Sequence, residues 1–179
     1  DSVTTRNVER NSNGHGWLGI RFQTEPNAQP SQILIHLQLW GKEYIQDQET
    51  LGAFGINLIF GAYEYHDRPE FLIESLGDSI PKGHMEVDVI EFTGPAFKDV
   101  DNRLMSLKLV EAGLANAAIF NPQGTMVEPS ELFYKKSVLI QRGSFRPVTR
   151  LAMDMLECSI AEFIQEPKVQ SKEVVILLE

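Results

Sequence analysis

Polar and apolar residues alternate in two stretches near the start of the chain. The first covers residues 17–23 (WLGIRFQ), and the second has apolar residues at every other position, at Ile33, Ile35, Leu37 and Leu39. A period of two is typical of half-buried β-strands. Because a short segment with two prolines separates the stretches, the pattern predicts two strands that open the fold as a hairpin.

The pattern changes to a helical one farther along the chain. Residues 46–63 are apolar nearly all round a helix and contain three glycines, which offer small surfaces for close packing. They predict a buried central helix. A second, shorter helix is predicted after Asp67, because Pro69 and Glu70 follow it in the arrangement of a capping box.

The second half of the chain alternates strand and helix signals. The predicted elements are strands at 85–92, 117–120, 133–141 and 174–178, one helix capped by Asp101 or Asn102, and another capped by Thr149. The first of these helices has a predicted inner face at Leu104, Leu107, Val110 and Leu114. Alternating elements with continuous apolar runs predict a mixed, largely parallel α/β sheet flanked by helices.

Composition divides the chain into a tail and one domain. Residues 1–16 are rich in Asn, Ser, Thr and charge, and they predict a polar, disordered tail. Residues 17–179 contain no linker or internal repeat and predict a single α/β domain. Since the chain ends one residue after a strand of the buried type, we expect it to be the N-terminal part of a larger protein.

Charge and cysteine content narrow the classes of partner. The 179 residues include 16 Lys or Arg and 25 Asp or Glu, a formal charge of −9 that disfavours bulk nucleic-acid binding. The most apolar stretch, 51–63, is shorter than the ~20 residues of a membrane span, so no membrane insertion is expected. Cys158 is the only cysteine, and a reducing, cytoplasmic location fits a chain without an internal disulfide.

A local excess of positive charge stands out against this acidic background. Residues 132–153 contain five Lys or Arg and no acidic residue. Arg142, Ser144 and Arg146 lie there between a predicted strand and helix, where guanidinium groups and a hydroxyl would bind phosphate or carboxylate, with Arg103 as a further candidate. The alternative is that these cations are solvated or paired with surface carboxylates.

Two other groups of residues are secondary candidates. Asp99, Asp101 and Asn102 follow the end of a predicted strand, where α/β proteins often bind a metal or a ribose, and helix capping is the alternative. His66 has acidic residues on both sides, an arrangement that would suit a general base, and a polar connection between helices is the alternative.

Histidine and cysteine spacing predicts no metal site. The four histidines and one cysteine are scattered without the intervals of metal ligands, and the sequence specifies no cofactor. His36 lies in the second predicted strand and is interpreted as a packed or hydrogen-bonded residue.

Five stretches carry a resemblance to a known group of proteins. They are GWLGIRFQ at 16–23, LGAFGINLIFGA at 51–62, VDNRLMSLKLVEAGL at 100–114, EPSELFYKK at 128–136 and RGSFRPVT at 142–149. They resemble a family of uncharacterised bacterial proteins that genomes label as TonB-dependent receptor or nicotinate-nucleotide adenylyltransferase. The resemblance covers nearly everything after Gly16. It implies the N-terminal portion of a longer protein and brings no established mechanism with it.

These observations leave three hypotheses of function. The first is a domain of a larger intracellular protein that binds a small phosphate or carboxylate anion. The second is a non-catalytic scaffold that forms a homo-oligomer or docks to a C-terminal region missing from this chain. The third, implied by the resemblance, is a nucleotide-handling transferase. The sequence does not decide whether the chain is an enzyme.

Overall fold

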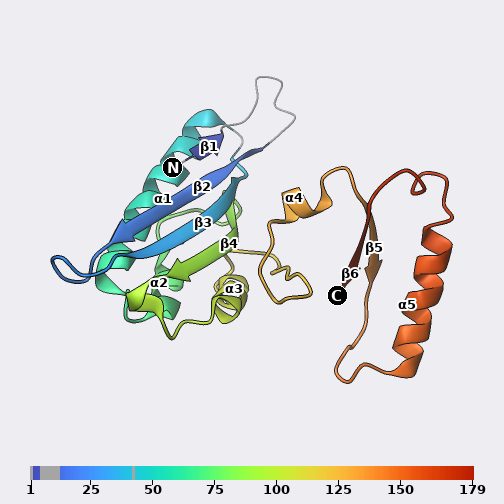
Figure 1. Cartoon of the computed structure of the whole chain (residues 1–179). Coiled ribbons are helices and arrows are strands. Elements are labelled where there is room, and N and C mark those ends of the chain that lie inside the picture. The colour runs from blue at the N-terminus through green and yellow to red at the C-terminus, as the bar shows by residue number, and fades with distance from the viewer. Residues whose placement is uncertain (1, 5–12, 42) are drawn as a thin grey trace. The chain divides into compact units, whose positions relative to one another are not determined.

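The computed structural model describes residues 2–4, 13–41 and 43–179 of the chain (Figure 1). It divides into two compact units, the N-terminal unit Asp1–Glu128 and the C-terminal unit Pro129–Glu179.

The N-terminal unit is built on an antiparallel sheet. Its strands are β1 (Ser2–Thr4), β2 (Gly14–Phe22), β3 (Ser31–Leu39) and β4 (Met85–Thr93), in the order β1-β2-β3-β4, and every neighbouring pair is antiparallel (Figure 1). The prediction of a largely parallel sheet is therefore wrong. The eight residues between β2 and β3 are too few for the crossover that a parallel pair requires, so the two strands form the predicted hairpin.

Helices cover one face of this sheet. They are α1 (Tyr44–Glu64), α2 (Pro69–Ser75) and α3 (Asn102–Glu111), with a 3₁₀ turn, η1 (Pro95–Phe97), between β4 and α3. The predicted central helix is confirmed by α1. The core contains the alternate apolar residues of β3 that were predicted to line one face of the strand. It also contains side chains from all three helices. Its members include Ile35, Leu37, Phe54, Leu72 and Leu109.

A β-bulge interrupts the pairing of β3 with β4. His36 pairs with Val89, whereas the next residue, Leu37, pairs with Val87, so Asp88 is an additional residue on β4. Leu37 and Val87 are both fully buried in the core. A bulge of this kind re-aims side chains. Here it directs Asp88 to the side of the sheet opposite the core, which we call the outer face and which also carries His36.

Part of the predicted polar tail belongs to the sheet. Residues 2–4 form β1, and residues 14–16 form the beginning of β2. Val3 is the only apolar residue among these six, and their strand structure comes from backbone pairing across β1 and β2, which a compositional argument does not detect. Residues 1 and 5–12 of the predicted tail lie outside the described residues.

The C-terminal unit contains a small parallel sheet. Its elements are α4 (Pro129–Phe133), β5 (Ser137–Gln141), α5 (Arg150–Phe163) and β6 (Val174–Leu178), and β5 pairs with β6 in parallel from Ser137↔Val174 to Gln141↔Leu178. The connection through α5 is the helical crossover that parallel strands need. As predicted, Thr149 caps α5, its hydroxyl accepting a hydrogen bond from the Ala152 amide at 3.2 Å.

None of the helices in the described part of the chain has the length and apolar content to cross a membrane.

Candidate metal centre

Two histidines from adjacent strands meet on the outer face of the N-terminal sheet. His15 lies on β2 and His36 on β3, where Trp17 is directly opposite His36 and His15 is its diagonal neighbour. Diagonal residues of an antiparallel pair are close enough for long side chains to meet. Nδ1 of His15 is 3.4 Å from Nε2 of His36. The register of the hairpin therefore brings two imidazoles together.

Glu128 adds a carboxylate to this pair from the end of the unit. Its Oε1 lies 3.8 Å from Nε2 of His36. One ligand atom from each of His15, His36 and Glu128 can be chosen so that all three lie within 4.8 Å of one another. We call these three residues the metal centre.

A buried carboxylate lies behind His36. Oδ1 of Asp88 is 2.6 Å from Nδ1 of His36, and the two residues are only 4% and 1% exposed. The other oxygen of Asp88 accepts a hydrogen bond from Nε2 of Gln38 at 2.9 Å. A carboxylate on one imidazole nitrogen fixes the orientation of the ring and presents the other nitrogen to a metal. Asp88 thus aims Nε2 of His36 toward His15 and Glu128.

The spacing of the three groups fits a small divalent ion. Zinc binds imidazole nitrogen at about 2.0–2.1 Å and carboxylate oxygen at about 2.0–2.2 Å, which places tetrahedral ligand atoms roughly 3.3 Å apart. The separations of 3.4 Å and 3.8 Å are close to that value. The ring of His36 is already held by Asp88, so His15 and Glu128 are the side chains that would move to complete the set.

An indole ring lies against the centre on one side. The ring centroid of Trp17 is 4.9 Å from that of His36, and Trp17 is 37% exposed. It shields one edge of His36 from solvent while leaving its own outer surface accessible. The centre is therefore partly enclosed, with His36 buried and His15 exposed.

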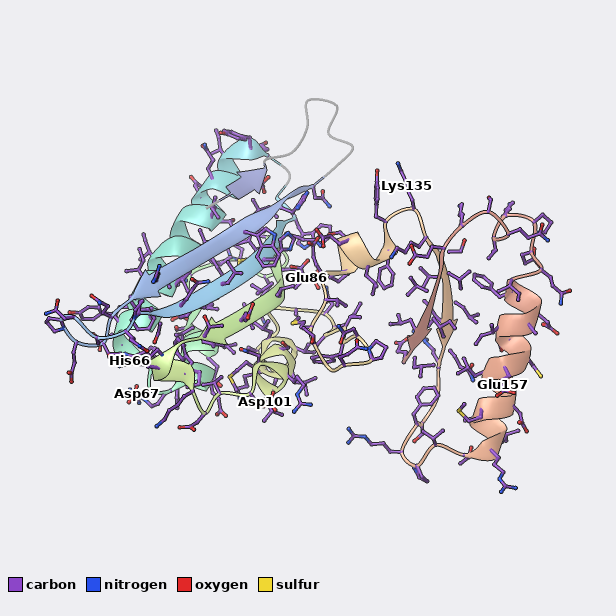
Figure 2. The ribbon with its side chains drawn as sticks, in the orientation of Figure 1. His66, Asp67, Glu86, Asp101, Lys135 and Glu157 are labelled. Atoms are coloured by element: carbon purple, nitrogen blue, oxygen red, sulfur yellow. The ribbon has the colours of Figure 1, made fainter. Side chains whose placement is uncertain are left out.

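The hairpin that leads to Glu128 is fixed by short-range bonds. Oδ1 of Asn121 accepts from the amides of Gln123 and Thr125, at 3.0 and 2.9 Å, and an isolated bridge joins Phe120 to Met126. At its base, the Asn116 amide donates to Oε1 of Glu86 on β4 at 2.9 Å (Figure 2). These contacts explain how a residue so far along the sequence reaches the outer face.

The residues predicted to bind an anion belong to both units. Arg142, Ser144 and Arg146 are exposed in the connection between β5 and α5, whereas Arg103 lies on α3 of the N-terminal unit. The guanidinium of Arg142 donates to both carboxylate oxygens of Glu179, at 2.9 and 3.2 Å, and this hydrogen bonding raises the pKa of Arg142. Arg142 thus has a carboxylate partner within the chain. The anion site stays a prediction.

The structure brings Arg103 together with the secondary candidates Asp99, Asp101 and Asn102. All four line a hollow of about 600 Å³ beside β4. Asp101 caps α3 by accepting from the Arg103 amide at 2.9 Å and also binds its guanidinium, and these hydrogen bonds lower the pKa of Asp101 (Figure 2). Asn102 bonds to both the amide and the carbonyl of Phe92. The capping interpretation accounts for Asp101.

His66 lies just beyond the end of α1, beside Asp67 (Figure 2). It is half-buried, and its Nδ1 is 3.3 Å from the carbonyl oxygen of Tyr63. Its ring contacts that of Phe22 edge-on, at a centroid distance of 6.0 Å, in a hollow of about 510 Å³. Its role as a general base stays a prediction.

The sequence analysis did not group these three residues. It assigned His15 to the tail, gave Glu128 no role and interpreted His36 as a packed or hydrogen-bonded residue, and the bond to Asp88 confirms the hydrogen bonding of His36. The available signal was the predicted hairpin, since extending the alternation of its first strand back from Trp17 places His15 on the same face as Trp17.

No family model, curated protein or solved structure matches the chain. The resemblance to the bacterial family therefore stays a prediction, and the function is argued from the residues of the metal centre.

Proposed function

We propose that the N-terminal unit binds a divalent transition-metal ion, with zinc as the best fit, through His15, His36 and Glu128. The observation that carries this proposal is the buried pair of Asp88 and His36, joined at 2.6 Å. Metal-binding histidines almost always have such an outer carboxylate, carbonyl or water on their second nitrogen. Two imidazoles and a carboxylate are ligands that suit zinc and neighbouring metals.

The competing explanation is a network of hydrogen bonds and ion pairs without a metal. A protonated His36 would then lie between the carboxylates of Asp88 and Glu128. Burying such groups is costly, and apolar residues of similar volume often stabilise a fold equally well or better. A metal gives a reason to place both His15 and Glu128 at Nε2 of His36, and a direct binding measurement separates the two explanations.

Three protein ligands leave room for a fourth. Structural zinc sites are closed by four protein groups, whereas sites that bind or activate small molecules retain a position for water or another ligand. The proposed site, with three protein ligands, is of the second kind. A phosphate or carboxylate that takes the fourth position would make this unit an anion-binding domain through residues other than the arginines named from the sequence.

Cobalt and zinc titrations test the proposal. We expect Co²⁺ to give visible absorption bands typical of low coordination number, and Zn²⁺ to displace it and to raise the melting temperature, since a ligand at a hundred times its Kd stabilises by about 2.7 kcal/mol. His36→Gln removes the central ligand and should abolish these effects. His66→Gln, at a half-buried histidine outside the metal centre, is the matched control and should leave them unchanged.

Asp88→Asn tests the positioning role of the buried carboxylate. The amide retains the shape of the side chain but weakens its hold on Nδ1 of His36, so metal affinity should fall by about 10- to 100-fold. The expected result is weaker binding with the same stoichiometry and the same cobalt spectrum. Equal zinc affinity in wild type, His36→Gln and His66→Gln, or no binding at all, would contradict the proposal.

Proton competition provides a second check. Histidine binds metal as the neutral imidazole, so protons compete with zinc for the site. The apparent Kd for zinc should rise as the pH falls, by up to about tenfold per pH unit for each histidine that must lose its proton. An affinity that does not change between neutral and acidic pH would show that zinc binds elsewhere.

A further inference from the structure

Helix α1 has apolar residues on two sides, and only one side is buried. The buried side contributes Phe54 and Leu58 to the core. The other side carries six apolar side chains that are each more than half exposed: Tyr44, Ile45, Ile56, Ile59, Phe60 and Tyr63. A helix that is apolar nearly all round is normally covered all round. The exposed side of α1 is therefore expected to have a partner of its own.

The exposed apolar area is large for an isolated molecule. A fully covered aromatic side chain buries about 150–250 Å², so the three aromatic residues on this side, each more than half exposed, offer on the order of 300 Å². The three isoleucines add to this area. Contiguous apolar patches on monomeric proteins rarely exceed a few hundred Å², and larger ones mark interaction sites.

The exposed positions of α1 repeat with the spacing of a coiled coil. Residues 45, 49, 52, 56, 59 and 63 are all exposed, and the intervals between them alternate between four and three residues. This is the spacing of the a and d positions along which two helices pack. We call these residues the exposed seam, which consists of Ile45, Glu49, Gly52, Ile56, Ile59 and Tyr63.

The exposed seam is complementary to a second copy of itself that runs in the opposite direction. Two antiparallel copies of a helix are related by a two-fold axis, so positions equally far from its midpoint, on opposite sides, meet. With the axis at the midpoint of α1, Gly52 faces Ile56 of the second copy. A Cβ added at Gly52 would meet nothing within 4 Å, so the space that the Ile56 side chain would enter is open. In a parallel pair Gly52 would face Gly52 and leave a gap.

The charges on α1 favour a helix over a lipid surface as the occupant of the seam. Helices that lie on membranes carry Lys or Arg beside their apolar side, which bind anionic lipids. Residues 44–64 contain no Lys or Arg and three acidic residues, Asp47, Glu49 and Glu64. In an antiparallel pair, the partial positive charge at each helix N-terminus lies beside the partial negative charge at the C-terminus of the other helix.

We propose that the exposed seam of α1 packs against the same seam of a second copy of the chain, as an antiparallel helix pair in a two-fold symmetric dimer. Symmetric dimers are the commonest soluble oligomers. Helix α1 packs on one face of the sheet with its seam turned away from the core, whereas the metal centre lies on the outer face (Figure 1). The dimer therefore leaves the metal centre accessible, and this inference does not rest on the proposed function.

Sedimentation velocity of the full chain in EDTA tests the proposal, because EDTA prevents association through a shared ion. We expect a monomer–dimer equilibrium at micromolar concentrations. Ile56→Glu should abolish the dimer, since it buries two carboxylates at the centre of the pair. Ile56 is 69% exposed and glutamate is the better helix former, so the folded monomer should keep its melting temperature. Leu104→Glu, at an exposed leucine of α3, is the matched control and should still dimerise.

Glu49→Leu should have the opposite effect. Glu49 is the only charged residue of the seam and faces Ile59 of the second copy in the proposed register. Leucine at this position adds two buried side chains to the interface, so the dimer should bind at least about tenfold more tightly. Unfolding does not produce a tighter dimer, so this result is separate from any loss of structure.

Cross-linking tests the direction of the pair. In a Cys158→Ser background, Gly55→Cys places a thiol near the two-fold axis and Ile45→Cys places one near the end of α1. The two copies of residue 45 lie roughly 27 Å apart along an antiparallel pair, at about 1.5 Å per residue. A short bis-maleimide should therefore link Gly55→Cys into dimers and leave Ile45→Cys unlinked.

The outcomes distinguish this dimer from other uses of the seam. A chain that stays monomeric overturns the inference, and faster hydrogen exchange of the C-terminal unit in Ile56→Glu would then identify that unit as the occupant of the seam. A dimer that Ile56→Glu leaves intact forms through another surface, and cross-linking of Ile45→Cys shows a parallel pair. Either result also overturns the inference.

Discussion

The two units differ in how completely they bury their apolar residues. In the N-terminal unit, β3 and the three helices around it enclose a core in which Ile35, Phe54 and Leu72 are fully buried. In the C-terminal unit, where every residue is described, Val169 is the only one that is buried, and neither α4 nor α5 contains a buried residue. The first unit has the core of an independent domain, and the second has only one layer of helix on two strands.

The difference follows from the kind of sheet each unit contains. An antiparallel sheet needs a cover on one face only, which α1, α2 and α3 provide. Parallel strands occur almost always in sheets covered on both faces, and a sheet of two strands is marginal at best. The apolar residues that the C-terminal unit leaves exposed include Ile140, Leu151, Met155, Ile176 and Leu178. Its stability should therefore be much lower.

Amide hydrogen exchange on the full chain should show the largest effect. Amides of β3 and β4 should exchange only through global unfolding, for which domains typically require about 5–15 kcal/mol, whereas those of β5 and β6 should exchange at least about a thousandfold faster through local opening. Mass spectrometry of peptic fragments resolves the two sheets. Equal protection of both would show that the C-terminal unit has a core that its own residues do not provide, and the comparison would fail.

Replacing one isoleucine by alanine in each sheet tests the difference in burial at single residues. Ile35 is fully buried in the middle of β3, and Ile176 is 41% exposed in the middle of β6. Ile35→Ala should cost about 2–5 kcal/mol of unfolding free energy, because it removes buried methyl groups and leaves a cavity. Ile176→Ala should cost less than about 1 kcal/mol. Urea denaturation of both variants measures the difference, and similar costs would contradict the assignment of the core to the N-terminal unit.

Long periodic patterns were predictable from the sequence, whereas strand direction was not. The central helix, the alternation in β3 and the Thr149 cap all follow from local physical chemistry and are confirmed. The prediction of a largely parallel sheet was wrong because a continuous apolar run in a strand indicates how many of its faces are covered. It does not report which strand lies next to it or in which direction that neighbour runs.

The inner face of α3 was predicted only in part. Of the residues that the apolar spacing favoured, Val110 and Leu114 pack against the core and Leu104 and Leu107 are exposed. The buried residues of the helix include Met105 and Leu109. Both sets have helical spacing, so the pattern alone does not choose between them. The hydrogen bonds between the side chain of Asn102 and the backbone of Phe92 help to fix the rotation of the helix about its axis. They depend on the tertiary structure, so the spacing of apolar residues does not reveal them.

The metal centre depends on features of the same kind. Strand alternation places His15 and His36 on one face, but the approach of Asp88 requires a bulge, and that of Glu128 requires a hairpin far along the chain. Neither has a signature that a single sequence makes recognisable. The two histidines were visible in the sequence, but His15 was assigned to the polar tail, and the four histidines and one cysteine lack the spacing of metal ligands.

A glycine in each unit tests how tightly its backbone is packed. Gly94 has a φ of 97°, and a Cβ added there would lie 2.6 Å from Cα of Ser31. Gly94→Ala should therefore cost at least about 1–3 kcal/mol. At Gly143 an added Cβ would meet only the ring of Phe145, at 3.6 Å, so Gly143→Ala should change stability by no more than about 0.5 kcal/mol. Thermal denaturation of both variants provides the measurement, and a near-neutral Gly94→Ala would contradict the close contact between β3 and the turn after β4.

The smallest expected effect tests whether the two units unfold independently. The hydroxyl of Thr149 satisfies an amide in the first turn of α5, and loss of such a cap typically costs about 1 kcal/mol. Thr149→Ala should therefore speed exchange of the α5 amides about fivefold, with no change in β3 or β4. Ser159→Ala in the same helix is the control, because the Ser159 hydroxyl only returns a bond to the Met155 carbonyl and alanine is the better helix former. It should slow exchange slightly. If Thr149→Ala also speeds exchange in β3, the units unfold as one, and the stability of the C-terminal unit depends on its neighbour.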